Sequence, residues 1–285
     1  MKLLLDVGNS RVKWAFVSAG GWLAQGEAVH DDEAKLRPLF AAGHAPDDIR
    51  LANVAGASTG ERLAARLEEC FHVVPVFASS ARHGAGVENG YADAAQLGVD
   101  RWLAICAAYH RYQAAVCVVD AGTATTIDVV SASGEHRGGL ILPGLRLMEL
   151  ALMRGTSDLA QRGAASDLQT EGQTPTGSLG YADAPVLTLG HDTVAAIRYG
   201  ALQATSSLVW ACLDECRGRG SPVAIFPTVL VTGGAGSLLQ ASLLKEAGVR
   251  GALAPSGIRI ELRPQLVLEG LALDPRCFVA APCVL

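Results

Sequence analysis

The chain opens on five residues, MKLLL, whose apolar run predicts a short buried strand, and Asp6 follows directly. From Arg11 to Val17 polar and apolar residues alternate, which is typical of the second strand of a hairpin. Gly8 and Asn9 lie between these segments, and both tolerate a positive φ, so we expect them to form the turn. The bend therefore gathers a carboxylate, a hydroxyl, backbone amides and the ammonium of Lys13.

The same pattern returns near the middle of the chain. The stretch VVDAGTATTIDVVSASGEHRGG aligns with LLLDVGNSRVKWAFVSAGG so that Asp6 falls on Asp120 and Gly8 falls on Gly122. Two such bends at matched positions indicate a duplicated lobe. We therefore predict an α/β protein of two duplicated lobes, residues 1–115 and 116–285, whose hairpin loops face each other across an interlobe cleft.

Alternating helices and strands are expected between and after the two hairpins. The apolar periodicity predicts helices over 34–41, 59–70 and GVDRWLAICAAYHRY, and short strands over 49–54 and 73–78. LILPGLRLMELALMR reads as a strand, a Pro-Gly break and a helix, and VAIFPTVLVTGGAGSLLQASLL as a strand, a glycine turn and a helix. HDTVAAIRYGALQATSSLVWACLDECRGRG predicts one long helix, interrupted or kinked near Gly200, and LVLEGLALD predicts a closing helix. Residues 155–190 lack a clear period, and we interpret them as an active-site loop or lid.

Composition and charge argue against two classes of protein, nucleic-acid-binding and membrane-spanning. The 285 residues are 50% hydrophobic, enough for one large core or two ordinary ones. A net charge of -5 argues against a nucleic-acid surface, which needs a basic face. No apolar stretch is long enough to cross a bilayer, and the opening run lacks the charge order of a secretory signal, so we expect a cytoplasmic protein. The seven scattered cysteines are expected to be reduced structural thiols.

The two bends are suited to nucleotide phosphates. Turn amides can donate to phosphate oxygens, a carboxylate at each strand end can hold a cation, and Lys13 adds a point charge. The Gly233-Gly234 turn allows the backbone to approach an adenine or ribose closely. Neither a P-loop motif nor a dinucleotide-binding glycine motif is present. Taken alone, one Asp-x-Gly-Asn bend can be a plain Asx-turn, and Asp100 can be a plain helix N-cap.

Five motifs in order, DVGNSRVKWA, YADAAQLGVDRW, VVDAGTATTID, GGLILPG and VTGGAG, resemble those of the type III pantothenate kinases. This family belongs to the actin/hexokinase/Hsp70-like superfamily, whose lobes are ribonuclease H-like. The resemblance covers nearly the whole chain. It implies ATP-dependent phosphorylation of pantothenate to 4'-phosphopantothenate, the first step of coenzyme A biosynthesis. Some members of the family are also described as accessory factors of a virulence regulator.

The resemblance also implies residue roles. Asp100 would be the general base, Asp120 would hold the monovalent cation, K⁺ or NH₄⁺, that these kinases need, and Asp6 would lie near Mg²⁺. The family forms homodimers in which the partner subunit helps to close the pantothenate site, through the region around GGLILPG. The first phosphate loop would be Asp6, Val7, Gly8, Asn9, Ser10, Arg11, Val12 and Lys13, with Thr123 also touching ATP phosphate; Tyr91, Gly98, Val99, Asp100, Arg101 and Thr193 would contact pantothenate.

The chemistry of the implied substrate agrees with these roles. A primary alcohol is a poor nucleophile until its proton is accepted, and a carboxylate within hydrogen-bond reach can accept it. The guanidinium of Arg101 can grip the substrate carboxylate while Asp100 faces the hydroxyl. Two alternatives stay open: another small-molecule kinase of the same superfamily, and a non-catalytic transcriptional accessory protein. A filament-forming actin-like ATPase would need long interface insertions, which the sequence lacks.

Overall fold

The computed structural model describes residues 1–29, 33–41, 43–155, 187–216, 227–250 and 257–273. The chain divides into two compact units. The first contains Met1–Gln113, Val130–Gly138 and the segment from Gln265, and the second contains Ala114–Val129 and Gly139–Pro264. The extents predicted from sequence, 1–115 and 116–285, stay a prediction.

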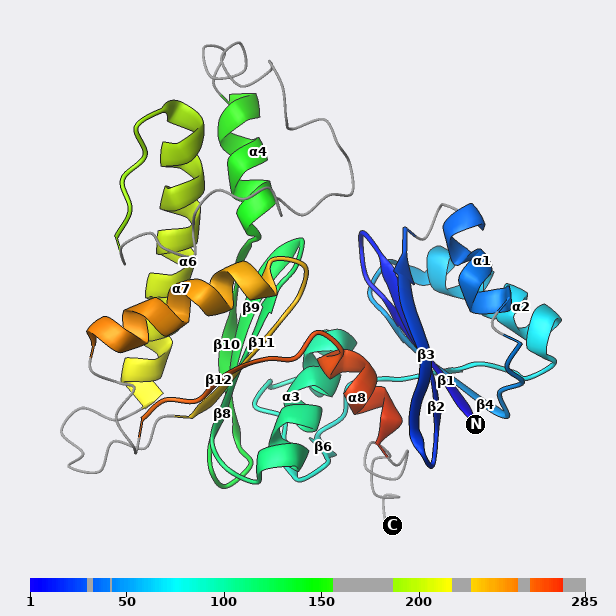
Figure 1. Cartoon of the computed structure of the whole chain (residues 1–285). Helices are drawn as coiled ribbons and strands as arrows, with labels where there is room; N and C mark the ends of the chain where they lie inside the picture. Colours follow the sequence, from blue (N-terminus) through cyan, green and yellow to red (C-terminus); the bar gives the residue numbers. More distant parts are fainter. Residues whose placement is uncertain (30–32, 42, 156–186, 217–226, 251–256, 274–285) are drawn as a thin grey trace. The chain divides into compact units, whose positions relative to one another are not determined.

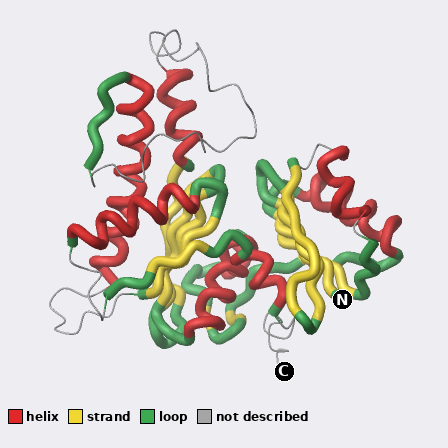
Figure 2. The backbone as a smooth tube through the Cα atoms, in the orientation of Figure 1, coloured by secondary structure: helices red, strands yellow, loops and turns green. Residues whose placement is uncertain are grey.

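The first unit is built on a five-stranded sheet in the order β3-β2-β1-β4-β5. Strands β1 and β2 pair antiparallel, as the opening hairpin predicts, and β4 and β5 run parallel to β1. Alternation sends Leu3, Leu5 and Val7 to one face, where they pack with residues of α1 and α2. The other face is covered by α3 and α8 (Figures 1 and 2). The elements are β1 (Lys2–Val7), β2 (Val12–Ser18), β3 (Gly21–Ala28), α1 (Glu33–Ala41), β4 (Asp48–Asn53), α2 (Ala57–Phe71), β5 (Val76–Phe77), β6 (His83–Gly84), β7 (Val87–Glu88), α3 (Val99–Tyr112) and α8 (Leu266–Ala272).

The second unit repeats this topology. Its sheet runs in the order β10-β9-β8-β11-β12, which matches the first sheet position by position. Its core joins alternate residues of β8 and β11, including Val119 and Val231, to α6 and α7. The duplication predicted from the two Asp-x-Gly bends is therefore confirmed, and both units have the α/β fold expected. The elements are β8 (Val116–Ala121), β9 (Ala124–Val130), β10 (His136–Pro143), α4 (Leu145–Gly155), α6 (Thr193–Cys216), β11 (Thr228–Thr232), α7 (Gly236–Val249) and β12 (Ile260–Leu262).

Helix α6 confirms the predicted long helix and is continuous from Thr193 to Cys216, so the predicted interruption at Gly200 is wrong, while a kink there stays a prediction. Glycine costs about 1 kcal/mol relative to alanine inside a helix. The stripe of buried residues that begins at Ala201 and ends at Leu213 outweighs that cost. Strand β3 and the short strands β6, β7 and β12 were not predicted, and most of the proposed lid at 155–190 lies outside the described residues. Among the helices described, none is long and apolar enough to cross a membrane.

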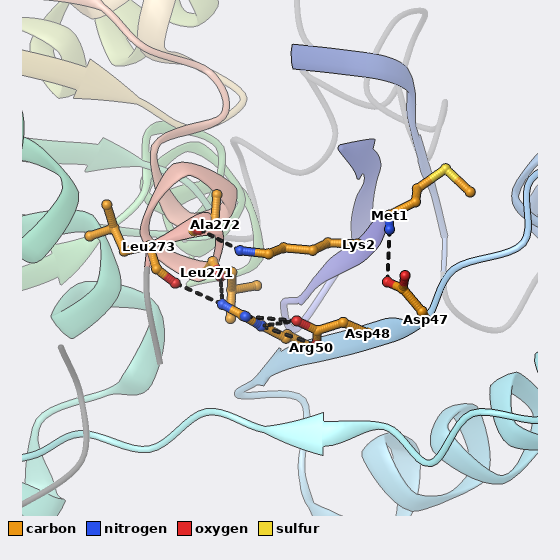
Figure 3. Close-up of polar contacts among 8 residues, drawn as sticks. All are labelled: Met1, Lys2, Asp47, Asp48, Arg50, Leu271, Ala272 and Leu273. Atoms are coloured by element: carbon orange, nitrogen blue, oxygen red, sulfur yellow. Dashed lines mark hydrogen bonds and ion pairs between the residues drawn. The ribbon is translucent and has the colours of Figure 1, made fainter. Parts of the chain in front are cut away.

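Two basic side chains of the first sheet hold the end of α8 (Figure 3). Arg50 Nη1 donates to the carbonyl oxygens of Leu271 and Leu273 at 2.9 and 2.7 Å, and Lys2 Nζ donates to that of Ala272 at 3.1 Å. Asp48 pairs with the same guanidinium at 2.7 Å. The last carbonyls of a helix lack partners within the helix, and cations are favourable there. This clamp joins the end of the described chain to the N-terminal sheet.

Arg50→Ala is expected to lower the free energy of unfolding by about 2 kcal/mol, because it leaves two helix-end carbonyls and Asp48 without their partner. Urea unfolding followed by circular dichroism measures the change. The matched control is Arg137→Ala, which removes an exposed ion pair with Glu135 and should change stability by less than about 0.5 kcal/mol. Equal effects of the two substitutions would contradict the clamp.

Candidate functional site

The first candidate phosphate loop joins β1 to β2. Asp6 and Lys13 are direct partners in the antiparallel register, so their side chains share one face of the sheet. That face lies opposite the α1–α2 core, and both residues are partly exposed. Gly8 N donates to Arg11 O at 2.9 Å, which closes the bend, while Asn9 and Ser10 are exposed at its tip. Gly8 and Asn9 lie in the turn as predicted, and neither has a positive φ.

Glu27 on β3 is part of this loop's surroundings, although the sequence analysis did not single it out. Its carboxylate forms an ion pair with Arg11. In the β2–β3 register Glu27 is also the direct partner of Lys13. An acidic side chain therefore lies beside both cations of the loop. It orients Arg11, and it lowers the positive potential that the two cations present to an anion.

The second candidate loop follows β8 at the corresponding position. Asp120 pairs with Thr232 in the parallel register between β8 and β11, on the face opposite the α6–α7 core. The carboxylate of Asp120 lies against Gly233, where an added Cβ would be 2.4 Å from Oδ1 of Asp120 and 2.6 Å from the carbonyl oxygen of Ala121. Gly233 also has a φ of 86°. A side chain at this position would occupy the space beside two oxygen atoms, and only glycine leaves it open.

Thr123 continues this loop and is exposed. Its carbonyl oxygen accepts a hydrogen bond from Gly144 N at 3.0 Å, and Gly144 O accepts one from Met148 N at the start of α4. The predicted Pro-Gly break thus fixes the loop to the N-terminus of α4. The Gly233-Gly234 turn is held to the end of β8 in a similar way, because Ala235 N donates a hydrogen bond to Ala121 O at 2.9 Å.

Asp100 is the second residue of α3, and the N-cap position belongs to Gly98. A simple N-cap role for Asp100 is therefore wrong. Its Oδ1 accepts a hydrogen bond from Arg101 N at 2.8 Å. A Cβ added to Gly98 would be 2.6 Å from that oxygen, so the carboxylate folds over the glycine. Asp100 is partly exposed, and the helix N-terminus favours its negative charge.

Arg101 and Tyr91 form a contact next to this carboxylate. Nη1 of Arg101 donates to the hydroxyl oxygen of Tyr91 at 3.0 Å, and the guanidinium carbon lies 5.7 Å from the centre of the Tyr91 ring. Arg101 is only 8% exposed. A guanidinium held against an aromatic face has its planar fork oriented before any anion arrives. Three of the residues predicted to contact pantothenate are therefore neighbours within the first unit.

The loop that carries Tyr91 is held by two residues that the sequence analysis did not single out. Asn89 is 1% exposed, and its side chain accepts from Tyr91 N at 3.0 Å and donates to the carbonyl oxygens of Ala81 and Ala94. Arg82 Nη1 donates to the carbonyl oxygens of Asn89 and Tyr91 at 2.8 and 3.0 Å. The dipeptide Asn89-Gly90 is of a kind that favours turns, so the sequence could have predicted a turn here. The backbone at Tyr91 is fixed from both sides.

Thr193 begins α6 in the second unit and is partly exposed. Asp192 caps this helix, because its side chain accepts from Ala195 N at 2.8 Å and its carbonyl oxygen accepts from Ala196 N. Thr193 therefore lies in a different unit from Tyr91, Asp100 and Arg101. Within the described residues, no three His, Cys, Asp or Glu side chains gather as ligands of one metal ion.

A buried ion pair joins α6 to α4. Arg198 Nε lies 3.6 Å from Oε2 of Glu149, and burial raises the pKa of the Glu149 carboxyl, while Arg198 and Arg146 oppose that rise. A carboxyl whose pKa is higher in the folded state contributes most to stability below its unfolded pKa, about 4.3, and loses that contribution as pH rises through the folded pKa. The ionised form of Glu149 therefore costs stability at neutral pH.

The Glu149→Gln variant is expected to gain free energy of unfolding relative to the unaltered chain as pH rises from about 4 to 7, because the neutral amide escapes the desolvation cost.

Arg198→Ala is expected to lower the free energy of unfolding by about 3 kcal/mol at pH 7, because it leaves a buried carboxylate without its ion pair to Arg198. Urea unfolding at both pH values measures the two differences. A Gln variant that loses relative stability with rising pH would contradict this sign.

Comparison with known proteins shows which family this chain resembles. The family model described as type III pantothenate kinase matches residues 2–214. A protein of Halorhodospira halophila named type III pantothenate kinase is 36% identical over 281 residues, which cover 95% of this chain and 96% of that protein. One of the same name from Ectopseudomonas mendocina is 35% identical over 280 residues, covering 96% and 98%. Another, from Aromatoleum aromaticum, is 42% identical over 159 residues, covering 56% and 65%.

Two solved structures share the fold. One, from Campylobacter jejuni, is described as a Baf family transcriptional activator and aligns with a TM-score of 0.53, 19% identity and 94% coverage of both chains. The other, from Sinorhizobium meliloti, is described as a 2-dehydro-3-deoxygalactonokinase and aligns with a TM-score of 0.53, 17% identity and coverage of 95% and 97%. At these identities the likeness establishes the two-lobed α/β architecture.

Proposed function

This chain belongs to the type III pantothenate kinase family, and we propose that Asp100 acts as the general base when it transfers the γ-phosphoryl group of ATP to pantothenate. The reaction converts the primary alcohol of pantothenate to 4'-phosphopantothenate, releases ADP and begins coenzyme A biosynthesis. We place this activity in the cytoplasm.

The observation that supports these roles best is the cluster of Asp100, Arg101 and Tyr91 at the start of α3. Pantothenate carries a carboxylate at one end and the reacting alcohol at the other. The oriented guanidinium of Arg101 offers a bidentate partner for the carboxylate. Asp100, the preceding residue, is partly exposed and presents an oxygen acceptor to the alcohol proton. Acceptance of that proton by Asp100 makes the alcohol oxygen a competent nucleophile.

The phosphate side of the reaction is assigned to the two Asp-x-Gly loops. Lys13 adds positive charge for the β- or γ-phosphate, and the exposed tip at Asn9 and Ser10 offers donors. The Asp6 carboxylate offers oxygen atoms that would hold Mg²⁺, and it shares a sheet face with Lys13, which would attract the same phosphates. Thr123 is the corresponding exposed donor in the second loop. Bound Mg²⁺ offsets the charge on the transferred phosphoryl group.

Asp120 is assigned to a monovalent cation, K⁺ or NH₄⁺. The Asp120 carboxylate and the Ala121 carbonyl present oxygen atoms to the space that Gly233 leaves open. Oxygen atoms are the ligands that hard cations prefer, so these residues fit the group. A bound cation there supplies positive charge beside the phosphate loop.

We also propose a homodimer that pairs through β10 and α4. Strand β10 is an edge of its sheet and exposes Leu140 and Ile141, the latter to 64%, while α4 exposes Leu147 and Leu152. Exposed apolar side chains in neighbouring elements mark an interaction surface. Ile141→Asp should convert a dimer into a monomer in multi-angle light scattering, whereas Leu244→Asp, at an exposed leucine on α7, should leave the mass unchanged. A monomeric unaltered chain would contradict the dimer.

The activity is tested by incubating the protein with γ-labelled ATP and pantothenate in K⁺ buffer and detecting labelled 4'-phosphopantothenate. A panel of acceptor alcohols, including sugars and small hydroxy acids, tests the choice of substrate. Phosphorylation of pantothenate alone supports the proposal. Transfer to a sugar instead would favour another kinase of the superfamily, and binding of substrates without transfer would favour a non-catalytic role.

A further inference from the structure

His136 is a buried side chain beside the Asp100–Arg101–Tyr91 cluster, and none of the roles above uses it. It is the first residue of β10 and is only 1% exposed, although the next residue, Arg137, is exposed. Burial of an imidazole at the start of an edge strand removes a polar ring from water. The groups packed around His136 show which interactions replace its contact with water.

His136 contacts the loop that carries Tyr91 through both its ring and its backbone. Its ring and the Tyr91 ring are nearly parallel, with an interplanar angle of 10° and centroids 6.0 Å apart. This distance is within the range of offset-stacked aromatic pairs. The backbone is equally close, because a Cβ added to Gly90 would lie 1.9 Å from the carbonyl oxygen of His136. Gly90 is the residue between Asn89 and Tyr91, so the loop lies directly against β10.

We propose that His136 is a positioning residue for the substrate carboxylate: by stacking on Tyr91 it fixes the aromatic ring that orients the Arg101 guanidinium. This inference rests on the proposed function, because it assigns the carboxylate of pantothenate to Arg101. It names a further residue, in a different element, that acts through Tyr91 and does not touch the substrate.

The division of contacts around Tyr91 supports this role. Asn89 and Arg82 bond the backbone amide and carbonyl of Tyr91, and these two hydrogen bonds hold the main chain but not the ring. The ring itself is fixed by two contacts, the stack on His136 and the hydrogen bond that its hydroxyl accepts from Arg101. Without the stack, the Tyr91 ring would lose the contact that does not involve the guanidinium it orients. The guanidinium would then lose a fixed partner when it binds the substrate.

The test compares His136→Ala with His136→Phe in the full-length protein. His136→Ala should raise the KM for pantothenate about threefold to tenfold, the effect that one aromatic pair supports, with little change in kcat or in the KM for ATP. His136→Phe keeps a stacking ring and should restore the KM to within about twofold. His110→Ala, at an exposed histidine in the last turn of α3, is the control and should be unchanged. Thermal unfolding verifies that each variant is folded.

A double substitution tests whether His136 acts through Tyr91. If it does, Tyr91→Ala with His136→Ala should raise the KM for pantothenate no more than Tyr91→Ala alone. Additive effects, equal changes in both KM values, or an unchanged KM in folded His136→Ala would each overturn the inference. Failure of the proposed function is separate, because the unaltered protein would then not phosphorylate pantothenate. Pantothenate binding measured by calorimetry with a non-hydrolysable ATP analogue gives the same comparison without turnover.

Discussion

Asp100→Asn is expected to lower kcat by roughly 10²–10⁴-fold while pantothenate and ATP still bind, because the amide has the shape of the carboxylate but does not accept the alcohol proton. The neighbouring contacts should survive, since the amide oxygen can still accept from Arg101 N. Loss of a negative charge in the first turn of α3 should cost only about 0.3–1 kcal/mol of stability. Labelled-phosphate transfer measures kcat, and calorimetry measures binding of each substrate.

The control for this substitution is Glu135→Gln, which removes an exposed carboxylate of the same unit and leaves the α3 N-terminus intact. It should retain full activity. Near-normal phosphorylation by Asp100→Asn would remove Asp100 from the role of base. Loss of pantothenate binding by that variant, with the fold intact, would instead assign Asp100 to substrate binding.

Replacing K⁺ by Na⁺ is expected to lower the activity of the unaltered protein sharply. Asp120→Ala is expected to lower activity in K⁺ by about 10²-fold, because the alanine variant lacks the carboxylate assigned to the cation. The diagnostic feature is the loss of cation dependence. The unaltered protein should discriminate between K⁺ and Na⁺, whereas Asp120→Ala should respond equally to both. Initial rates in matched chloride salts measure this.

Gly233→Ala tests the proposed cation position without removing the Asp120 carboxylate. Its added Cβ would enter the space beside the Asp120 carboxylate and the Ala121 carbonyl, so it should weaken cation dependence although every oxygen donor is retained. Gly234→Ala is the matched control for the K⁺/Na⁺ activity ratio, because a Cβ there meets no atom within 4 Å and so stays clear of the Asp120 carboxylate. Indifference of the unaltered enzyme to the cation would contradict the assignment of Asp120. Equal effects at the two glycines would contradict the proposed cation position.

Local pattern was sufficient for much of the fold. The alternation in Arg11–Val17 predicted β2, the apolar periodicity of GVDRWLAICAAYHRY predicted α3, and both are confirmed. The two Asp-x-Gly bends predicted a duplication, which the identical strand orders confirm. These successes have one cause: strand pleat, helical repeat and turn chemistry depend on residues that are neighbours in sequence. The roles of the candidate site residues remain proposals, although their positions at strand and helix ends were readable from the same patterns.

The sequence by itself determined the order of most helices and strands, the repeat and the candidate acids Asp6, Asp100 and Asp120. Tertiary structure alone decided which distant residues meet: Arg50 with the end of α8, Glu27 with Arg11, and His136 with Tyr91. It also decided that α6 continues through Gly200, since burial of one helix face outweighed a local preference. Contacts of this kind depend on how sheets and helices bring separated segments together, and no local periodicity encodes that arrangement.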